Sequence, residues 1–245
     1  MRLRVHVDGP RSGAVNMSTD ARLLEEHRRG DDPILRIYRW QPAAVSYGYH
    51  QSESDFDRRI IDERGWDLVR RPTGGRAILH AEELTYAVVG SSPSTLFGTT
   101  LHATYMRINE ALLRFLVNLD LAPDISGGES LTEARGAVCF QSAGQHEITV
   151  GGRKIIGSAQ RRRGDVFLQH GSILVGPAHA DLVDVLQRGD HDRARREALL
   201  DATTDLTRES KGTGDQRDFE GWTRTLIDAF AGALDLEPVD LGPTS

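Results

Sequence analysis

The stretch Arg70-Arg71-Pro72-Thr73-Gly74-Gly75-Arg76-Ala77-Ile78-Leu79-His80 is the most informative part of this chain. It places two adjacent glycines and three arginines between two segments that read as strands. Adjacent glycines allow positive φ and leave the crest of a loop without side chains, so backbone N–H groups can approach a ligand closely. Arginine side chains donate to carboxylate, phosphate or carbonyl oxygens. The residues alone fit a ligand-binding loop and a solvated surface hairpin equally well.

The segments around this loop predict strands and helices in alternation, and therefore an α/β fold. Apolar residues recur at helical spacing after Asn16, a candidate N-cap, and again between Leu101 and Leu119. Gly151-Gly152 separates two alternating runs and predicts a hairpin turn. We expect helices over 17–29, 57–63, 101–119 and 219–234, and strands over 34–38, 44–49, 66–71, 83–89, 147–150, 154–161 and 166–175. Pro177 is expected to begin a further helix, and residues 242–245 to form a frayed end.

The composition is typical of a soluble globular protein. The chain has 245 residues, enough for one large domain, with 38% hydrophobic and 27% charged residues. It contains no run of ~18 apolar residues, and its start lacks the apolar stretch of a secretory signal. A single cysteine excludes an internal disulfide framework and fits a reducing compartment, so we expect a cytoplasmic location. The formal net charge of −6 argues against a nucleic-acid platform.

The glycine-rich stretch continues to Tyr86 as RRPTGGRAILHAEELTY. This run resembles the signature loop of the lipoate and biotin protein ligase (BPL/LPL) superfamily, and the chain most resembles the octanoyltransferases of that group. Further segments match the superfamily's first helix, early strands and later strands: Asn16-Met17, Asp20 and Leu23-Leu24; residues 35–38, 40, 42 and 44–49; residues 152–161; and residues 169–174. The matches span about residues 16 to 176. His50 departs from the pattern, which would have another aromatic residue there.

The resemblance implies a fold and a division of the chain. The fold would be a class II synthetase or biotin–lipoate ligase-like catalytic domain, α/β (α+β) with a mainly antiparallel mixed sheet flanked by helices. We expect this catalytic domain over residues 1–215, with residues 216–245 adding a C-terminal helix that packs on the same domain.

Cys139 and Lys154 are the candidate catalytic residues. On composition alone, a lone cysteine in Ala137-Val138-Cys139-Phe140 is more often an inert core thiol, and Lys154 more often a solvated hairpin lysine. The resemblance instead implies an acyl-accepting Cys139. Lys154 follows fifteen residues later, across the Gly151-Gly152 turn, so a strand and its return could bring the ammonium beside the thiol. An ammonium about 4 Å from a thiolate attracts it by roughly 4 kcal/mol at an effective dielectric of about 20, enough to favour the thiolate at neutral pH.

The resemblance further implies a double displacement. Cys139 takes octanoyl from octanoyl-acyl carrier protein, and a lysine of a lipoyl domain or of glycine cleavage H protein then takes it as an amide. No ATP, metal or other cofactor is expected, because thioester exchange is near balance and amide formation runs downhill. The expected substrate-binding residues are Arg71, Gly74, Gly75, His80, Gly157, Ser158, Ala159 and His170. His80 and His170 fit structural histidines equally well.

Partners and competing functions remain open from the sequence. Acidic donor and acceptor proteins would dock on a basic patch, for which Arg153-Lys154 with residues 161–163 is the candidate. We expect a monomer with no nucleic-acid or membrane partner. An ATP-dependent lipoate-protein ligase of the split type is the nearest alternative, although the 69 residues after Gly176 are taken as too few for the accessory domain of full-length ligases. An octanoyl-H-protein amidotransferase and an inert module that binds carriers or lipoyl domains are the others.

Overall fold

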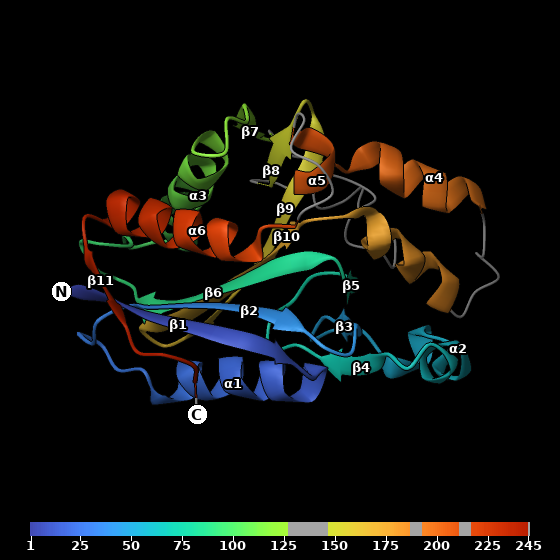
Figure 1. Ribbon diagram of the computed structural model, residues 1–245. Coiled ribbons are helices and arrows are strands. Elements are labelled where there is room, and N and C mark those ends of the chain that lie inside the picture. The colour runs from blue at the N-terminus through green and yellow to red at the C-terminus, as the bar shows by residue number, and fades with distance from the viewer. Residues whose placement is uncertain (127–146, 187–192, 211–216, 245) are drawn as a thin grey trace.

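An eight-stranded mixed sheet forms the centre of the protein (Figure 1). The computed structural model describes residues 1–126, 147–186, 193–210 and 217–244. The strand order is β11-β1-β2-β6-β10-β9-β8-β7, in which β1 runs parallel to β11 and β2 and all other neighbours are antiparallel. The strands are β1 (Arg2–Arg11), β2 (Ile34–Trp40), β6 (Glu83–Ser91), β7 (Pro123–Ile125), β8 (Ile148–Val150), β9 (Arg153–Arg163), β10 (Val166–Leu174) and β11 (Glu237–Asp240). The predicted α/β fold with a mainly antiparallel mixed sheet is confirmed.

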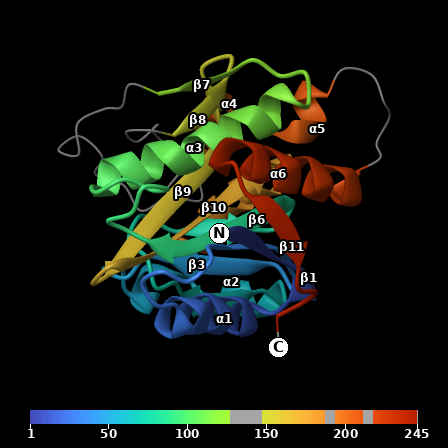
Figure 2. The ribbon, with the colours of Figure 1, turned by 90° about the vertical axis from the view of Figure 1, so that its left-hand side faces the viewer.

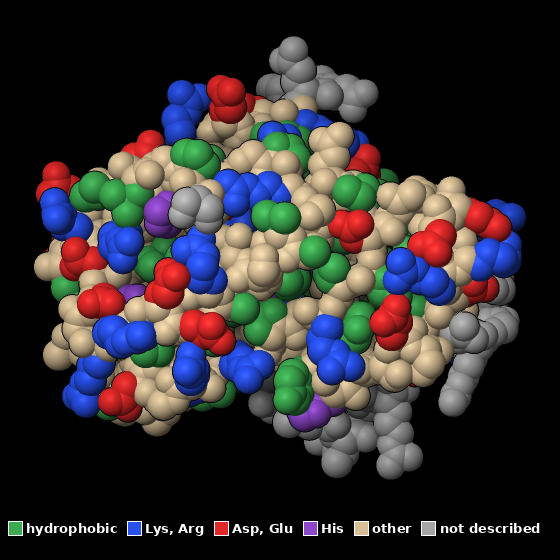
Figure 3. All heavy atoms as spheres, turned by 90° about the horizontal axis from the view of Figure 1, so that it is seen from below, with side chains coloured by type: hydrophobic (Ala, Val, Ile, Leu, Met, Phe, Trp, Pro, Cys, Tyr) green, Lys and Arg blue, Asp and Glu red, His purple; other side chains and the backbone are tan. Residues whose placement is uncertain are grey.

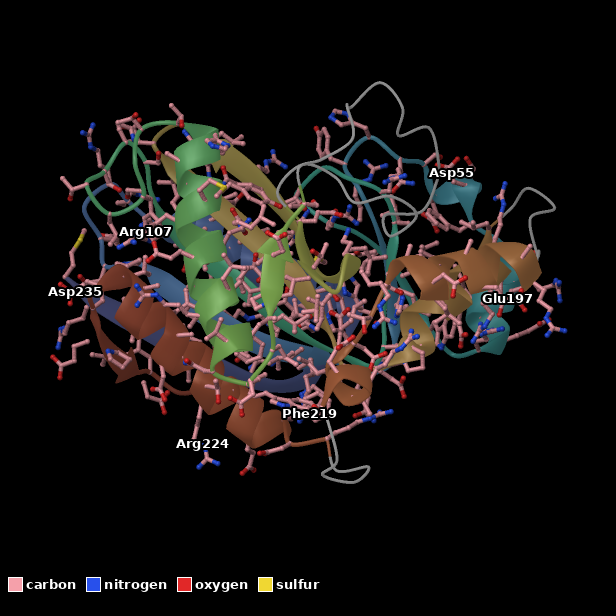
Figure 4. The ribbon with its side chains drawn as sticks, turned by 90° about the horizontal axis from the view of Figure 1, so that it is seen from above. Asp55, Arg107, Glu197, Phe219, Arg224 and Asp235 are labelled. Carbon is pink, nitrogen blue, oxygen red and sulfur yellow. The ribbon has the colours of Figure 1, made fainter. Side chains whose placement is uncertain are left out.

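Helices cover both faces of this sheet. Helices α3 (Leu101–Val117) and α6 (Phe219–Leu234) pack against each other on one face, and α1 (Gly13–Glu26) lies on the other (Figures 1 and 2). Figure 4 shows α6 running from Phe219 to Asp235, the left-handed residue that ends it, beside the helix that carries Arg107. Apolar residues spaced three or four apart on α3, such as Ile108, Leu112 and Leu116, are fully buried in the core between α3, α6 and the sheet.

A second, three-stranded sheet lies at one end of the molecule (Figure 1). Its strand order is β4 (Asp67–Arg70), β3 (Ala44–Tyr47) and β5 (Ile78–His80), with β3 parallel to β4 and antiparallel to β5. Its core is completed by α2 (Arg58–Glu63), η2 (Pro177–Val185) and α4 (Arg193–Ala202). Two other short helices are η1 (Glu53–Asp55) and α5 (Leu206–Glu209), and Leu206 of α5 packs in the core of the main sheet. In the parts of the chain that the structure describes, no helix is both long and apolar enough to cross a membrane.

The first helix begins four residues earlier than predicted. Ser12, and not Asn16, is its N-cap, with its hydroxyl accepting from Val15 N. Asn16 lies fully buried within the helix, and its side-chain amide donates to the backbone oxygens of Arg11 and Arg39. Asparagine is a common N-cap, but here its side chain donates hydrogen bonds to carbonyl oxygens near the ends of two strands. The local sequence does not reveal these partners.

The predicted frayed C-terminus is also wrong. Thr244 is buried, with its N–H donating to Asp8 Oδ1 at 2.7 Å and its hydroxyl donating to Asp8 Oδ2 at 2.8 Å. Strand β11 leads into this contact by pairing with β1, and neither strand was expected from the sequence. The C-terminal residues therefore close one edge of the main sheet.

Candidate active site

The glycine-rich loop packs tightly against the end of β3. Tyr49 N donates to Thr73 O at 3.0 Å, and Arg71 N donates to Tyr47 O at the same distance. Gly75 has φ of +90°, a conformation that favours glycine. A Cβ on Gly48 would lie only 1.9 Å from the Gly75 carbonyl oxygen, so glycine is required on both sides of this contact. The two glycines fix the loop against the small sheet.

Arg71 shapes the loop from inside. Its side chain is buried, and Nη2 donates to the backbone oxygens of Gly74 at 2.8 Å and Arg76 at 2.7 Å. Nη1 donates to the backbone oxygen and the hydroxyl of Ser46, at 3.1 and 3.2 Å. The guanidinium therefore holds a curved stretch of backbone around itself, as expected of a donor-rich planar group.

A narrow cavity of about 40 Å³ lies between α1, the main sheet and the small sheet. Its lining is mostly apolar and includes seven of the expected site residues: Arg71, Gly75, His80, Gly157, Ser158, Ala159 and His170. Other lining residues are Met17, Tyr38, Trp40, Ser46, Ile78, Thr85, Gly171 and Ser172. Among the described residues, Gly74 and Lys154 are not part of this lining, and Cys139 lies outside the described residues. Ser46 and Thr85 were not among the expected site residues, although both lie in stretches that match the superfamily, because the match did not show which of their side chains face the cavity.

His80 forms the centre of one polar cluster in the wall of the cavity. Its ring stacks on Trp40, with centroids 4.0 Å apart and planes 12° from parallel. Nδ1 lies 2.8 Å from Glu83 Oε1, and Nε2 lies 2.7 Å from the hydroxyl of Ser46. The ring is therefore fixed in both position and orientation.

Glu83 is fully enclosed and remains ionised. Burial raises the pKa of this carboxyl, but the nearby His80 and hydrogen bonds from His80, Ser172 and Thr85 outweigh burial and leave the pKa below its ordinary value. An ionised carboxylate only accepts hydrogen bonds, so both hydroxyls direct their hydrogens at Glu83.

His170 forms a second polar cluster in the wall of the cavity. Nδ1 lies 2.8 Å from Asp20 Oδ2, and Nε2 lies 2.7 Å from the hydroxyl of Thr73 in the glycine-rich loop. Asp20 also accepts from Arg36 Nη1 at 2.7 Å and from the Tyr38 hydroxyl at 2.8 Å. Burial raises the pKa of Asp20, but its contacts with His170, Arg36 and Tyr38 leave it lowered overall. The cluster thereby ties α1, β2 and β10 to the loop.

Lys154 is buried, not the solvated hairpin lysine that composition alone favoured. Its side chain is 1% exposed and forms an ion pair with Glu147, which the sequence analysis did not single out. The pairing of β8 with β9 shifts register beside Lys154, because Ile148 faces Ile156 while Thr149 faces Lys154. Such a bulge changes the direction in which side chains point. The sequence signal for this ion pair was a Glu seven residues before the Lys, on the other side of the Gly151-Gly152 turn.

The single basic patch expected on β9 is wrong. Lys154 is buried, and Arg153 pairs with Glu209 at 2.8 Å. Residues 161–163 lie at the other end of the strand, about 25 Å away at ~3.3 Å per residue. Arg161 there donates to Pro72 O at 2.8 Å, against the glycine-rich loop. The face shown in Figure 3 intersperses acidic and basic side chains.

One family of known proteins matches most of the chain. The family described as the lipoyl protein ligase A/B catalytic domain matches residues 12–231. Octanoyltransferase LipM of Carboxydothermus hydrogenoformans is 43% identical over 166 residues, covering 67% of this chain and 61% of that protein. Octanoyltransferase LipM of Moorella thermoacetica is 43% identical over 177 residues, covering 71% and 65%. The chain thus spans less than two thirds of the length of these two curated relatives.

Solved structures of related ligases share the fold. A putative lipoate protein ligase from T. acidophilum with bound lipoic acid superposes with a TM-score of 0.78 at 25% identity, covering 100% of this chain and 91% of that one. A lipoate-protein ligase A bound with ATP gives a TM-score of 0.80 at 25% identity, covering 100% and 90%.

Proposed function

Because the chain belongs to the lipoyl protein ligase A/B catalytic domain family, we propose that it is an octanoyltransferase acting in protein lipoylation. It takes octanoyl from octanoyl-acyl carrier protein and delivers it to a lysine of a lipoyl domain or of glycine cleavage H protein. Relatives bearing the name octanoyltransferase LipM support this reaction. The observation that carries the proposal is the buried ammonium of Lys154, held by Glu147 on the strand whose residues Gly157 to Ala159 line the cavity.

In the proposed reaction, Cys139 is the nucleophile and Lys154 its electrostatic partner. The thiolate attacks the thioester carbonyl of the donor, a new C–S bond forms, and the carrier thiolate leaves. The acceptor amine then attacks octanoyl-Cys139, an amide C–N bond forms and the enzyme C–S bond breaks. Solvent screens a buried ammonium less than an exposed one, and an ammonium has three donors, so Lys154 can stabilise negative charge on sulfur and on the oxyanion while it stays paired with Glu147.

The cavity is proposed to hold the octanoyl chain. Burying about seven methylene-scale groups contributes roughly 5 to 6 kcal/mol, which is enough to distinguish chain lengths. A volume of about 40 Å³ holds only about three water-sized groups at ~10–15 Å³ each. An eight-carbon chain therefore requires the cavity to widen, and the long, flexible side chain of Met17 in its lining suits such an adjustment.

A mass measurement on the intact protein tests the proposal. The protein is incubated with octanoyl-acyl carrier protein without ATP, and we expect a gain of one octanoyl group. Cys139→Ala should show no adduct, and Lys154→Met should form it at least tenfold more slowly, the rate equivalent of the ~1.4 kcal/mol lost with one modest charge interaction. Absence of an adduct on the wild-type protein would refute the transferase.

The solved ligases with bound lipoic acid or ATP favour one second candidate, an ATP-dependent lipoate-protein ligase. The wild-type protein and Cys139→Ala together distinguish this ligase from the transferase. A ligase would modify the acceptor from free lipoate only when ATP is present, and Cys139→Ala would keep that activity. The transferase requires the cysteine and is indifferent to ATP.

A further inference from the structure

The hydrogens of the His80 cluster can be assigned from its partners. Glu83 only accepts, because its lowered pKa keeps it ionised, so the His80 nitrogen that faces it, Nδ1, carries a hydrogen. Arg71 only donates, and it donates to Ser46 Oγ at 3.2 Å. The Ser46 hydroxyl therefore gives its own hydrogen to Nε2 at 2.7 Å. In the neutral ring, Nε2 holds a lone pair that points at a hydroxyl in the wall of the cavity.

From this arrangement we infer that Ser46 and His80 form a proton relay that deprotonates the acceptor amine, with Glu83 as its positioning residue. The inference rests on the proposed function and adds a base to its second step. Ser46 is the group that contacts the amine, and His80 accepts the proton through it. Both line the cavity, and both side chains are at least nine-tenths buried.

The acceptor lysine arrives as an ammonium, and one proton passes from its nitrogen to Ser46 Oγ while the Ser46 hydrogen moves to His80 Nε2. The free amine attacks octanoyl-Cys139, the C–N bond forms, the C–S bond breaks and thiolate leaves. The second proton of the nitrogen passes to this thiolate. The His80 imidazolium, held beside Glu83, then releases its proton to solvent.

The charges around His80 favour this role. Among the described residues, Glu83 pairs with no arginine or lysine, so its negative charge is available to the imidazolium. Arg71 is the cation on the other side of Ser46, to which it donates. Burial lowers the pKa of the neighbouring His179, while a hydrogen bond with the Gly176 oxygen and the charge of Glu83 raise it and Lys154 lowers it.

The test measures the two half-reactions separately on His80→Gln. His80 also lines the proposed octanoyl cavity, so both half-reactions can slow, but transfer to a lipoyl domain should fall about 10²-fold more than octanoyl-Cys139 formation does, the usual range for a lost general base. Discharge of the adduct by hydroxylamine, an amine that is largely unprotonated at neutral pH, should remain unchanged.

Two further variants keep the test decisive. Ser46→Ala removes only a hydroxyl and should slow transfer about tenfold, equivalent to one charge-assisted hydrogen bond, again without slowing the hydroxylamine reaction. His170→Gln is the matched histidine and should slow both half-reactions by the same factor. Equal losses in both half-reactions of His80→Gln, or full transfer in Ser46→Ala, would overturn the relay alone. Absence of any adduct on the wild-type protein would refute the proposed function and the relay with it.

Discussion

Two histidines in the wall of the cavity make nearly the same local contacts. In each, Nδ1 lies 2.8 Å from a carboxylate and Nε2 lies 2.7 Å from a hydroxyl. The two clusters differ in the other groups that contact each carboxylate. Asp20, the partner of His170, also binds the guanidinium of Arg36, which in turn binds Asp8 at 2.6 Å. Glu83, the partner of His80, has only hydroxyl groups as further donors among the described residues.

This difference separates a carboxylate that already pairs with an arginine from one that, among the described residues, is contacted by histidine and hydroxyl groups. The charge of Asp20 is already matched by a buried cation, so it offers little additional attraction to an imidazolium. The charge of Glu83 is stabilised first by His80 and then by the hydroxyl groups of Ser172 and Thr85, and no arginine or lysine pairs with it among the described residues. The same triad of carboxylate, imidazole and hydroxyl thus anchors the glycine-rich loop at His170 and is able to carry a proton at His80.

The largest expected effect comes from removing the cation that distinguishes the two clusters. Arg36→Met leaves Asp20 buried without its arginine partner and leaves Asp8 with Arg11 as its remaining arginine, and this should lower the free energy of unfolding by about 3–5 kcal/mol. Chemical denaturation of the purified proteins measures the change. Arg22→Met is the matched control, because Arg22 forms an exposed pair with Glu26 and should cost less than ~1 kcal/mol. Similar losses in the two variants would show that the buried network is not what stabilises this side of the cavity.

The free energy of unfolding should depend on pH in the acid range through the carboxylates of both clusters. The folded-state pKa values of Asp20 and Glu83 lie below their ordinary values of 3.8 and 4.5, so the unfolded chain binds more protons at acid pH. Stability is then complete above about pH 5 and falls as pH drops through 4.5 and below, by on the order of 1–3 kcal/mol.

Denaturation midpoints measured from pH 6 to pH 2 would test this, with Glu83→Gln as the informative variant. It should lose part of the acid dependence and keep the part that belongs to Asp20. High salt should change the wild-type curve little, since buried pairs are weakly screened. An unchanged acid dependence in Glu83→Gln would show that Glu83 is not held ionised by the fold.

The parts of the fold that the sequence predicted are those specified by neighbours in the chain. The glycine-rich loop, the Gly151-Gly152 hairpin and the long helices α3 and α6 follow from local spacing of apolar residues and turn residues. Strands β1 and β11 were missed because they are stabilised by pairing with each other across more than 200 residues, and both carry many polar side chains. Pro177 does begin a helical segment, but it is 3₁₀.

The sequence predicted most residues of the site, but it did not predict the hydrogen bonds and ion pairs that join them. His80 and His170 were candidates from the sequence, and the structure places both in the cavity wall. What distinguishes them is the contact of His170 with Asp20, which lies 150 positions earlier in the chain. Asp20 in turn accepts a hydrogen bond from Arg36. No periodicity encodes such a pair. The expected approach of Lys154 to Cys139 stays a prediction, because Cys139 lies outside the described residues.

The smallest effect should come from the hydroxyl that joins His170 to the loop. Thr73→Val keeps the shape of the side chain but leaves Nε2 of a buried ring without its partner, which should lower the free energy of unfolding by about 1 kcal/mol. Because this contact only positions the loop, the ratio of the two half-reaction rates should remain that of the wild type, even where both rates fall. Ser46→Ala removes the equivalent hydroxyl at His80 and should change that ratio. If Thr73→Val also slowed transfer selectively, the two histidines would share one role, and the charge on Arg36 would not be what separates them.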